Sequence, residues 1–227
     1  MIQNVNGITL YYEKTGEGQP IVLLHGNGET HQIFDVMTAQ LKDNYSVYAI
    51  DSRGHGQSTR VKELDYRNMA EDIVEFIRVI GLKKPILYGF SDGGILGLMI
   101  ASTYPELLSK LIISGANLIP EGIKKRYLKL FRILYYITRN PNYHLMVTQP
   151  QISDEELHKI IVPTLVLAGS KDLIKEEHTR HIAEAIPNCT MQILAGENHM
   201  SYVVHSNKLY SILEPFLMEE DLVKWIS

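Results

Sequence analysis

The chain contains very little cysteine, and several other features that define particular protein classes are missing from it. Cys189 is the single cysteine among 227 residues, so neither an internal disulfide nor a zinc site built on cysteine pairs is available. No apolar run approaches the roughly 20 residues that would span a bilayer. The 22 Lys and Arg are outnumbered by 26 Asp and Glu, and no basic stripe of the kind that binds nucleic acid is present. These absences predict a protein without nucleic-acid or membrane partners.

What the sequence does contain is typical of a globular protein. The apolar fraction of 45% and the charged fraction of 21% predict a sizeable core. The first residues, MIQNVNGITLYYEKTG, include neither a basic leader nor an apolar segment. This start predicts no secretory signal and a cytoplasmic location. No pattern in the sequence indicates an oligomeric state.

Short apolar runs recur along the chain and predict strands. The later runs are continuous, as in strands that are buried on both faces of a parallel sheet. Residues 66–80 have helical spacing and are followed by Gly81 as a stop signal. The first residues, with turns at Gly7 and at Gly16 to Gly18, predict an antiparallel hairpin at a sheet edge. The alternation of strands and helices predicts an α/β fold with a doubly wound, mostly parallel sheet. The predicted strands are 8–12, 21–25, 45–51, 85–90, 110–116, 163–169 and 190–195, and the other helices are 31–41, 92–103, 176–185 and 207–217.

One interval interrupts this alternation. More than forty residues separate the strand that ends near Ala116 from the strand that starts near Pro163, too many for a crossover helix alone. Lysines and arginines fill the polar positions of this interval and predict a solvated face, because binding to an anionic membrane would require more basic character. We expect a core of residues 1–116 and 162–227 and a short helical cap over residues 117–161. The cap contains an amphipathic helix whose apolar positions are Ile123, Tyr127, Leu130, Phe131, Leu134 and Tyr135.

Ser91 is the first candidate for chemistry. It lies in the G-x-S-x-G pattern from Gly89 to Gly93, between a predicted strand and a predicted helix. In that context a sharp turn projects the hydroxyl into a cleft, and the helix N-terminus supplies N–H groups. A simple helix cap would also place a serine here. The strand–turn–helix context favours a nucleophile.

A nucleophilic serine needs a base and an acid that orients the base. Asp172 follows the strand 163–169 and His199 follows the strand 190–195, so both lie at the edge where open α/β sheets bind ligands. Each alone is an ordinary polar loop residue, but their joint placement favours a catalytic triad with Ser91. Glu197 is a rival acid, although it is only two residues from His199.

The stretch His25-Gly26-Asn27-Gly28 is the candidate oxyanion hole. It follows a predicted strand, and its glycines allow the backbone to approach a substrate closely. The backbone N–H groups of Asn27 and Asp92 are the two candidate donors. A plain glycine-rich turn would explain the stretch as well. A phosphate cradle would not, because no lysine follows at the P-loop spacing.

Together, HGNG, the segment DSRGHGQS, GFSDGG, GSKD and ENHM resemble the α/β-hydrolase fold family over nearly the full chain. Residues 89–117 are most similar to the serine esterase branch that includes valacyclovir hydrolase, although the cap here is shorter. The resemblance implies an eight-stranded α/β-hydrolase sheet and the cleavage of small esters, including amino-acid esters, without a cofactor. It also implies that Arg53 and His55 belong to a structural loop without a catalytic role.

Alternatives to ester hydrolysis remain. The same triad serves C–C bond hydrolysis and perhydrolysis, and a receptor or binding protein with a slow triad is a further possibility because fold does not dictate function. Some relatives carry the acid after the strand that precedes the cap, where this chain has Asn117; its amide favours Asp172 as the acid. The carboxylate of Asp92 either meets the ammonium group of an α-amino ester or complements the helix dipole.

The remaining histidines and the large side chains of the cap give no site. His178 and His181 share a helix face without a third ligand, which predicts a wet surface and no metal. Lining of a pocket is the alternative for Tyr135, Tyr136 and Met146, and core packing is the expectation. The histidines without a partner pattern are His31, His144, His158 and His205.

Overall fold

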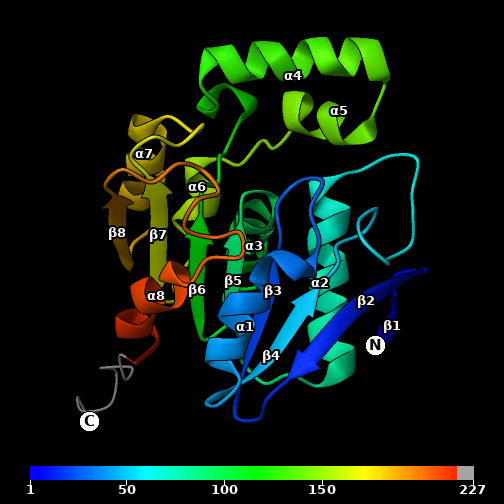
Figure 1. Ribbon diagram of the computed structural model, residues 1–227, viewed down its shortest axis with the longest axis vertical. Helices are drawn as coiled ribbons and strands as arrows, with labels where there is room; N and C mark the ends of the chain where they lie inside the picture. Colours follow the sequence, from blue (N-terminus) through cyan, green and yellow to red (C-terminus); the bar gives the residue numbers. More distant parts are fainter. Residues whose placement is uncertain (219–227) are drawn as a thin grey trace.

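The computed structural model describes residues 1–218, and one eight-stranded sheet runs through it (Figure 1). The strand order is β1-β2-β4-β3-β5-β6-β7-β8. β1 and β2 pair antiparallel, as do β2 and β4, and all other pairs are parallel. The predicted doubly wound, mostly parallel sheet is confirmed. The strands are β1 (Ile2–Val5), β2 (Ile8–Thr15), β3 (Gln19–Leu24), β4 (Tyr45–Ile50), β5 (Ile86–Phe90), β6 (Lys110–Ser114), β7 (Thr164–Gly169) and β8 (Cys189–Leu194).

The central strands are buried because helices cover both faces of the sheet. Along β3, Val22 and Leu24 belong to the apolar cluster shared with α2 and α3, whereas Ile21 and Leu23 belong to the cluster shared with α1 and α8. This alternation follows from the two-residue period of a strand. The helical elements are η1 (His31–Phe34), α1 (Asp35–Leu41), α2 (Tyr66–Ile80), α3 (Asp92–Thr103), η2 (Pro120–Gly122), α4 (Lys125–Thr138), α5 (Pro141–Thr148), α6 (Asp154–Leu157), α7 (Glu176–Ala185) and α8 (Lys208–Met218).

Local signals explain where several elements begin and end. The side chain of Asp65 accepts a hydrogen bond from the backbone N–H of Asn68 at the start of α2, and Gly81 ends the helix in the left-handed region at φ 76°. The edge hairpin forms at Gly7, which has φ 77°. The turn from Gly16 to Gly18 does not close a second hairpin, because β4 lies between β2 and β3.

The long interval between β6 and β7 contains η2, α4, α5 and α6, and we call residues 117–161 the cap. In Figure 1, α4 and α5 lie beyond the ends of β5, β6 and β7, with α5 between α4 and the sheet. Ile123 and Leu128 pack against Ile174, which holds the cap to the loop after β7. Within residues 1–218, none of the helices combines the length and the apolar character that a membrane span requires.

Several expectations about apolar side chains of the cap are wrong. The side chain of Leu130 is 47% exposed and that of Tyr136 is 73% exposed, so neither belongs to the core. Ile123 is buried but lies before α4. The apolar positions of α4 do not predict which of its side chains are buried. The helix packs on the rest of the protein along one side, and its apolar residues extend beyond that side.

Candidate functional site

The turn between β5 and α3 places Ser91 in a strained conformation. Its backbone has φ 52° and ψ −112°, outside the regions that non-glycine residues favour. The backbone N–H of Ser91 donates to the carbonyl of Ser114 at 2.7 Å, and its carbonyl accepts from the N–H of Ile95 at 3.0 Å. Its side chain makes no cap hydrogen bond to α3, so the simple cap interpretation is wrong. The hydroxyl is left available for other contacts.

Two glycines make this turn sterically possible. A Cβ atom on Gly89 would overlap the backbone carbonyl of Gly93, and a Cβ atom on Gly93 would overlap the carbonyl of Leu24. Both obstacles are backbone atoms of neighbouring strand and helix, which cannot move without shifting those elements. Close packing against these backbone atoms therefore explains why glycine occupies both positions beside Ser91.

Replacing Gly93 by alanine is expected to lower the free energy of unfolding by about 1–3 kcal/mol, as overpacking does in tightly packed cores. Urea unfolding at neutral pH measures this change. Gly97→Ala is the matched control, since the atoms nearest to its new Cβ are the side-chain ends of Leu111 and Leu87. An equal loss in both variants would contradict the role of the Leu24 carbonyl.

His199 lies in the loop after β8 and reaches Ser91. The distance between His199 Nε2 and Ser91 Oγ is 3.1 Å, within hydrogen-bond range. The ring packs against Phe90, with 4.9 Å between ring centroids. Gly115, at φ 64°, makes room for the imidazole, because a Cβ atom there would lie 2.6 Å from its Cε1. Sequence reasoning missed Gly115, although a glycine directly after a strand was a usable signal.

Asp172 lies on the other side of the imidazole. Its Oδ1 is 2.7 Å from His199 Nδ1 and accepts the backbone N–H of Ile174 at 2.9 Å. Burial alone would raise the pKa of this carboxyl, but the hydrogen bond and charge interaction with His199 hold the pKa below its usual value. An ionised Asp172 accepts a hydrogen bond from the N–H at Nδ1. The neutral ring then carries no proton on Nε2, which can accept a hydrogen bond from the Ser91 hydroxyl.

The rival acid Glu197 points elsewhere. Its carboxylate accepts the hydroxyl of Ser201 at 2.6 Å and pairs with the ammonium of Lys208 at 2.6 Å. The chain therefore brings Ser91, His199 and Asp172 together from three separate loops and leaves Glu197 outside. The amide of Asn117 donates to the carbonyl of Ile119.

The two candidate oxyanion donors lie on loops that are tied to each other. The side-chain amide of Asn27 donates to the Asp92 carboxylate at 2.9 Å, and the N–H of Gly93 donates to the carbonyl of His25 at 3.1 Å. Across residues 1–218, neither the backbone N–H of Asn27 nor that of Asp92 donates to another group of the protein. Both N–H groups therefore remain candidate oxyanion donors.

The Asp92 carboxylate is buried and already engaged. One oxygen accepts the hydroxyl of Tyr66 at 2.7 Å, and the other accepts the amide of Asn27. Burial raises the pKa of Asp92, and the two hydrogen bonds oppose that rise. The side chain also lines a cavity of about 20 Å³ next to Ser91 and His199. Its contacts with Tyr66 and Asn27 give Asp92 a structural task beyond the helix dipole.

A pocket of about 510 Å³ opens at Ser91 and His199. Its walls come from the loop of residues 26–29 after β3, the turn after β5, and α4 and α5 of the cap. Met146 lines it, so the expectation of core packing for Met146 is wrong. The remaining lining residues are Gly26, Asn27, Gly28, Glu29, Phe90, Phe131, Asn140, Asn142, Tyr143, Leu173 and Met200.

Glu29 is the functional candidate that sequence reasoning missed. Among the described residues that line the pocket it is the one carboxylate, and none of them is a lysine or an arginine. One oxygen accepts the backbone N–H of Gly26 at 3.1 Å. Burial raises the pKa of Glu29, while that hydrogen bond opposes the rise. The signal was its place three residues after Gly26, the spacing at which a side chain turns back to a loop N–H.

The expectation of a wet surface is wrong for His178 and holds for His181. The Nε2 atom of His178 accepts the backbone N–H of Leu118 at 2.9 Å, and burial lowers the pKa of His178 to about 4. His181 is exposed and pairs with Asp154 at 2.8 Å. The described part of the chain gathers no group of three or more His, Cys, Asp or Glu side chains that could hold a metal ion.

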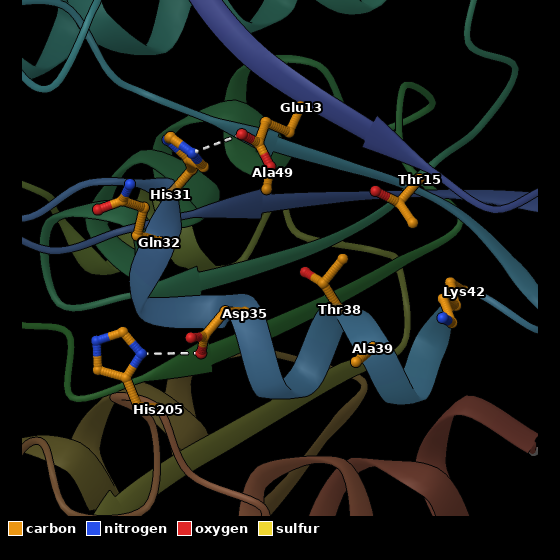
Figure 2. A pocket seen from close by; sticks show the side chains of 10 residues that line it. All are labelled: Glu13, Thr15, His31, Gln32, Asp35, Thr38, Ala39, Lys42, Ala49 and His205. Atoms are coloured by element: carbon orange, nitrogen blue, oxygen red, sulfur yellow. Dashed lines mark hydrogen bonds and ion pairs between the residues drawn. The ribbon is translucent and has the colours of Figure 1, made fainter.

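A second cavity, of about 490 Å³, lies between β2, α1 and the loop that carries His205 (Figure 2). His205 pairs there with Asp35 at 2.8 Å, and His31 contacts Glu13 at 3.2 Å and Asp51 at 2.7 Å. Both histidines thus have acidic partners that their sequence context did not indicate. Within residues 1–218, no hydroxyl group is hydrogen-bonded to either of these histidines, so the arrangement at Ser91 is the better candidate for nucleophilic catalysis.

Comparisons with known proteins identify the family of the chain. The sequence matches the alpha/beta hydrolase fold family over residues 19–143. It is 29% identical to the human serine hydrolase BPHL over 94% of this chain and 84% of that protein. It is 31% identical to a pimeloyl-[acyl-carrier protein] methyl ester esterase from Aliivibrio fischeri over 92% and 97% of the two chains. The solved esterase from Exiguobacterium antarcticum superimposes with a TM-score of 0.83 at 23% identity, covering 96% and 98% of the two chains.

Proposed function

The chain belongs to the alpha/beta hydrolase fold family, and we propose that it cleaves carboxylic esters of small substrates through Ser91, His199 and Asp172. The observation that carries this proposal is the pair of contacts of His199, at 3.1 Å to the Ser91 hydroxyl and at 2.7 Å to the Asp172 carboxylate. These distances support a serine–histidine–aspartate relay of the type that activates a hydroxyl for acyl transfer.

The reaction begins at the Ser91 hydroxyl. As its oxygen bonds to the ester carbonyl carbon, the proton moves to His199 Nε2, and Asp172 stabilises the imidazolium that forms. The backbone N–H groups of Asn27 and Asp92 donate to the oxyanion. The C–O bond of the ester then breaks, and His199 returns its proton to the leaving alcohol. Water repeats these steps on the acyl-enzyme, releasing the acid and restoring Ser91.

Labelling with a p-nitrophenyl phosphonate tests the proposal directly. We expect release of about one equivalent of p-nitrophenol and a covalent adduct on the peptide that contains Ser91, because a phosphonate traps an activated serine. Peptide mass spectrometry locates the adduct, and heat-unfolded protein is the control. An adduct on another residue would contradict the assignment. Labelling at Ser91 without turnover on a broad ester panel would instead indicate a binding protein with a slow triad.

The pocket supports small, uncharged or cationic substrates, including amino-acid esters. Its volume of about 510 Å³ lies in the range of sites for small molecules. Among its lining residues, Glu29 contributes a carboxylate with no lysine or arginine to offset it. An anionic acyl chain would therefore enter against like charge in a partly buried site.

Replacing Glu29 by glutamine is expected to raise kcat/KM for p-nitrophenyl succinate about tenfold relative to p-nitrophenyl butyrate, because removal of one nearby negative charge is worth about 1.4 kcal/mol. The ratio is measured at pH 8. Glu106→Gln is the matched control, since Glu106 is exposed and pairs with Lys84. An unchanged ratio in the Glu29 variant would show that its charge does not select substrates.

A further inference from the structure

The outward side of α4 exposes large apolar side chains. Leu130, Ile133, Tyr136 and Ile137 are 47%, 45%, 73% and 70% exposed, and we call these four residues the α4 outer face. The helical period places Leu130, Ile133 and Ile137 on the side of α4 opposite the buried Leu128, and Tyr136 lies at the flank of that side. Such a concentration of exposed apolar groups on one helix is unusual for a surface that meets only water.

The same segment is strongly basic. Residues 122–153 contain six lysines and arginines and none of the 26 Asp and Glu residues of the chain. Lys124 is turned inward, where its ammonium donates to the Asp172 carbonyl at 2.5 Å. Five exposed cations remain around the α4 outer face. They are Lys125, Arg126, Lys129, Arg132 and Arg139.

Few acidic groups offset these cations. Among the described residues Arg132 pairs with Glu121 at 3.3 Å, a contact between exposed side chains. Arg139 lies over the rings of Tyr135 and Tyr136, at 5.5 and 5.3 Å from their centroids. The cap therefore presents positive charge although the whole chain carries a net charge of −4.

We propose that the α4 outer face docks on a lipid bilayer whose surface carries anionic headgroups. Lysine and arginine beside exposed leucine, isoleucine and tyrosine is the composition of helices that lie in the plane of a membrane interface. Phosphate headgroups pair with the cations, and the apolar side chains insert beside them. The sequence alone predicted a solvated face, because its basic character was judged insufficient for a membrane and the local pattern did not show that Ile133 and Ile137 are exposed.

The position of α4 fits a flat partner. It is the outermost element of the cap, with α5 between it and the sheet (Figure 1), so a planar surface meets it without obstruction from the core. A symmetric second copy is disfavoured because it would place the basic cap against an identical basic cap. Since α4 also contributes Phe131 to the pocket at Ser91, docking would bring that pocket close to lipid-soluble esters.

Vesicle co-sedimentation with the full chain tests the proposal. We expect binding to phosphatidylcholine vesicles containing about 30% phosphatidylglycerol, and at least about tenfold weaker binding to pure phosphatidylcholine. Binding should fall in about 1 M NaCl, where the Debye length is about 3 Å. The variants Ile133→Ser/Ile137→Ser and Lys125→Gln/Lys129→Gln should each weaken binding about fivefold or more. Hydrolysis of a soluble ester should not change in either variant.

Matched controls remove similar groups elsewhere on the surface, with Val79→Ser for the apolar residues and Lys62→Gln/Lys83→Gln for the cations. Binding that is absent, or equal in all variants, would overturn the proposal. If the protein binds polyglutamate as strongly as the anionic vesicles, and the Ile133→Ser/Ile137→Ser variant binds polyglutamate as well as the native protein does, the partner would be an acidic protein instead. If light scattering shows that the native protein and the control variants are dimers and that the α4 variants are monomers, the partner would be a second copy. Both of these outcomes also overturn the bilayer proposal.

Discussion

Ser91→Ala is expected to lower kcat/KM for p-nitrophenyl acetate by roughly 10,000-fold or more, the scale seen when a nucleophilic serine is removed from a triad. The reason is chemical, since no other hydroxyl lies in hydrogen-bond contact with His199 among the described residues. Without it the acyl-enzyme cannot form. Steady-state kinetics with the purified variant measures the loss.

The folded state of this variant needs its own check. Circular dichroism and the thermal midpoint should match the native protein, or the variant should be slightly more stable, because alanine keeps the turn while strain at an active site trades stability for function. Ser109→Ala removes a hydroxyl before β6 and serves as the control with unchanged turnover. Near-native activity in the Ser91 variant would end the proposed mechanism.

Asp172→Asn is expected to reduce kcat about 10,000-fold while preserving the fold, by analogy with the same change in other triads. The asparagine amide can donate to His199 Nδ1, which moves the ring proton to Nε2. That tautomer cannot accept the proton of Ser91. Single-turnover kinetics on an activated ester would show the loss in the acylation step.

Two further variants make this test specific. Asp154→Asn alters another Asp–His pair, the exposed contact with His181 at 2.8 Å, and should leave kcat unchanged. The double variant Ser91→Ala/Asp172→Asn should be no slower than Ser91→Ala alone, because the groups act as a unit. Additive losses in the double variant would contradict the proposal that Ser91 and Asp172 act together through His199.

Local pattern was sufficient for most strands and helices of the core and for their order, whereas α5 and α6 of the cap were not predicted. The predicted helices 66–80, 92–103 and 176–185 have the same bounds as α2, α3 and α7. These helices carry clear stop signals or a clear period, and their apolar faces are covered by the sheet. The segment 31–41 was harder, because it divides into η1 and α1 at Asp35.

The candidate site was also predictable in part. Ser91, Asp172 and His199 were found because each follows a strand, and parallel strands bring their following loops to one edge of the sheet. The distances that join them were not accessible, since they depend on the room that Gly115 leaves for the imidazole. Glu29 escaped notice because its role depends on burial beside Ser91.

Periodicity and strand-following positions in the chain were enough to specify an α/β sheet with a candidate nucleophile at a strand–helix turn, because these signals act between residues that are close in sequence. The surroundings of the cap depended on packing between distant segments. That packing buries Leu128 against Ile174, leaves Ile133 and Ile137 exposed, and turns Met146 toward the pocket. An apolar residue on a helix has the same local pattern whether another segment covers it or not, and only the tertiary structure determines whether its side chain is buried.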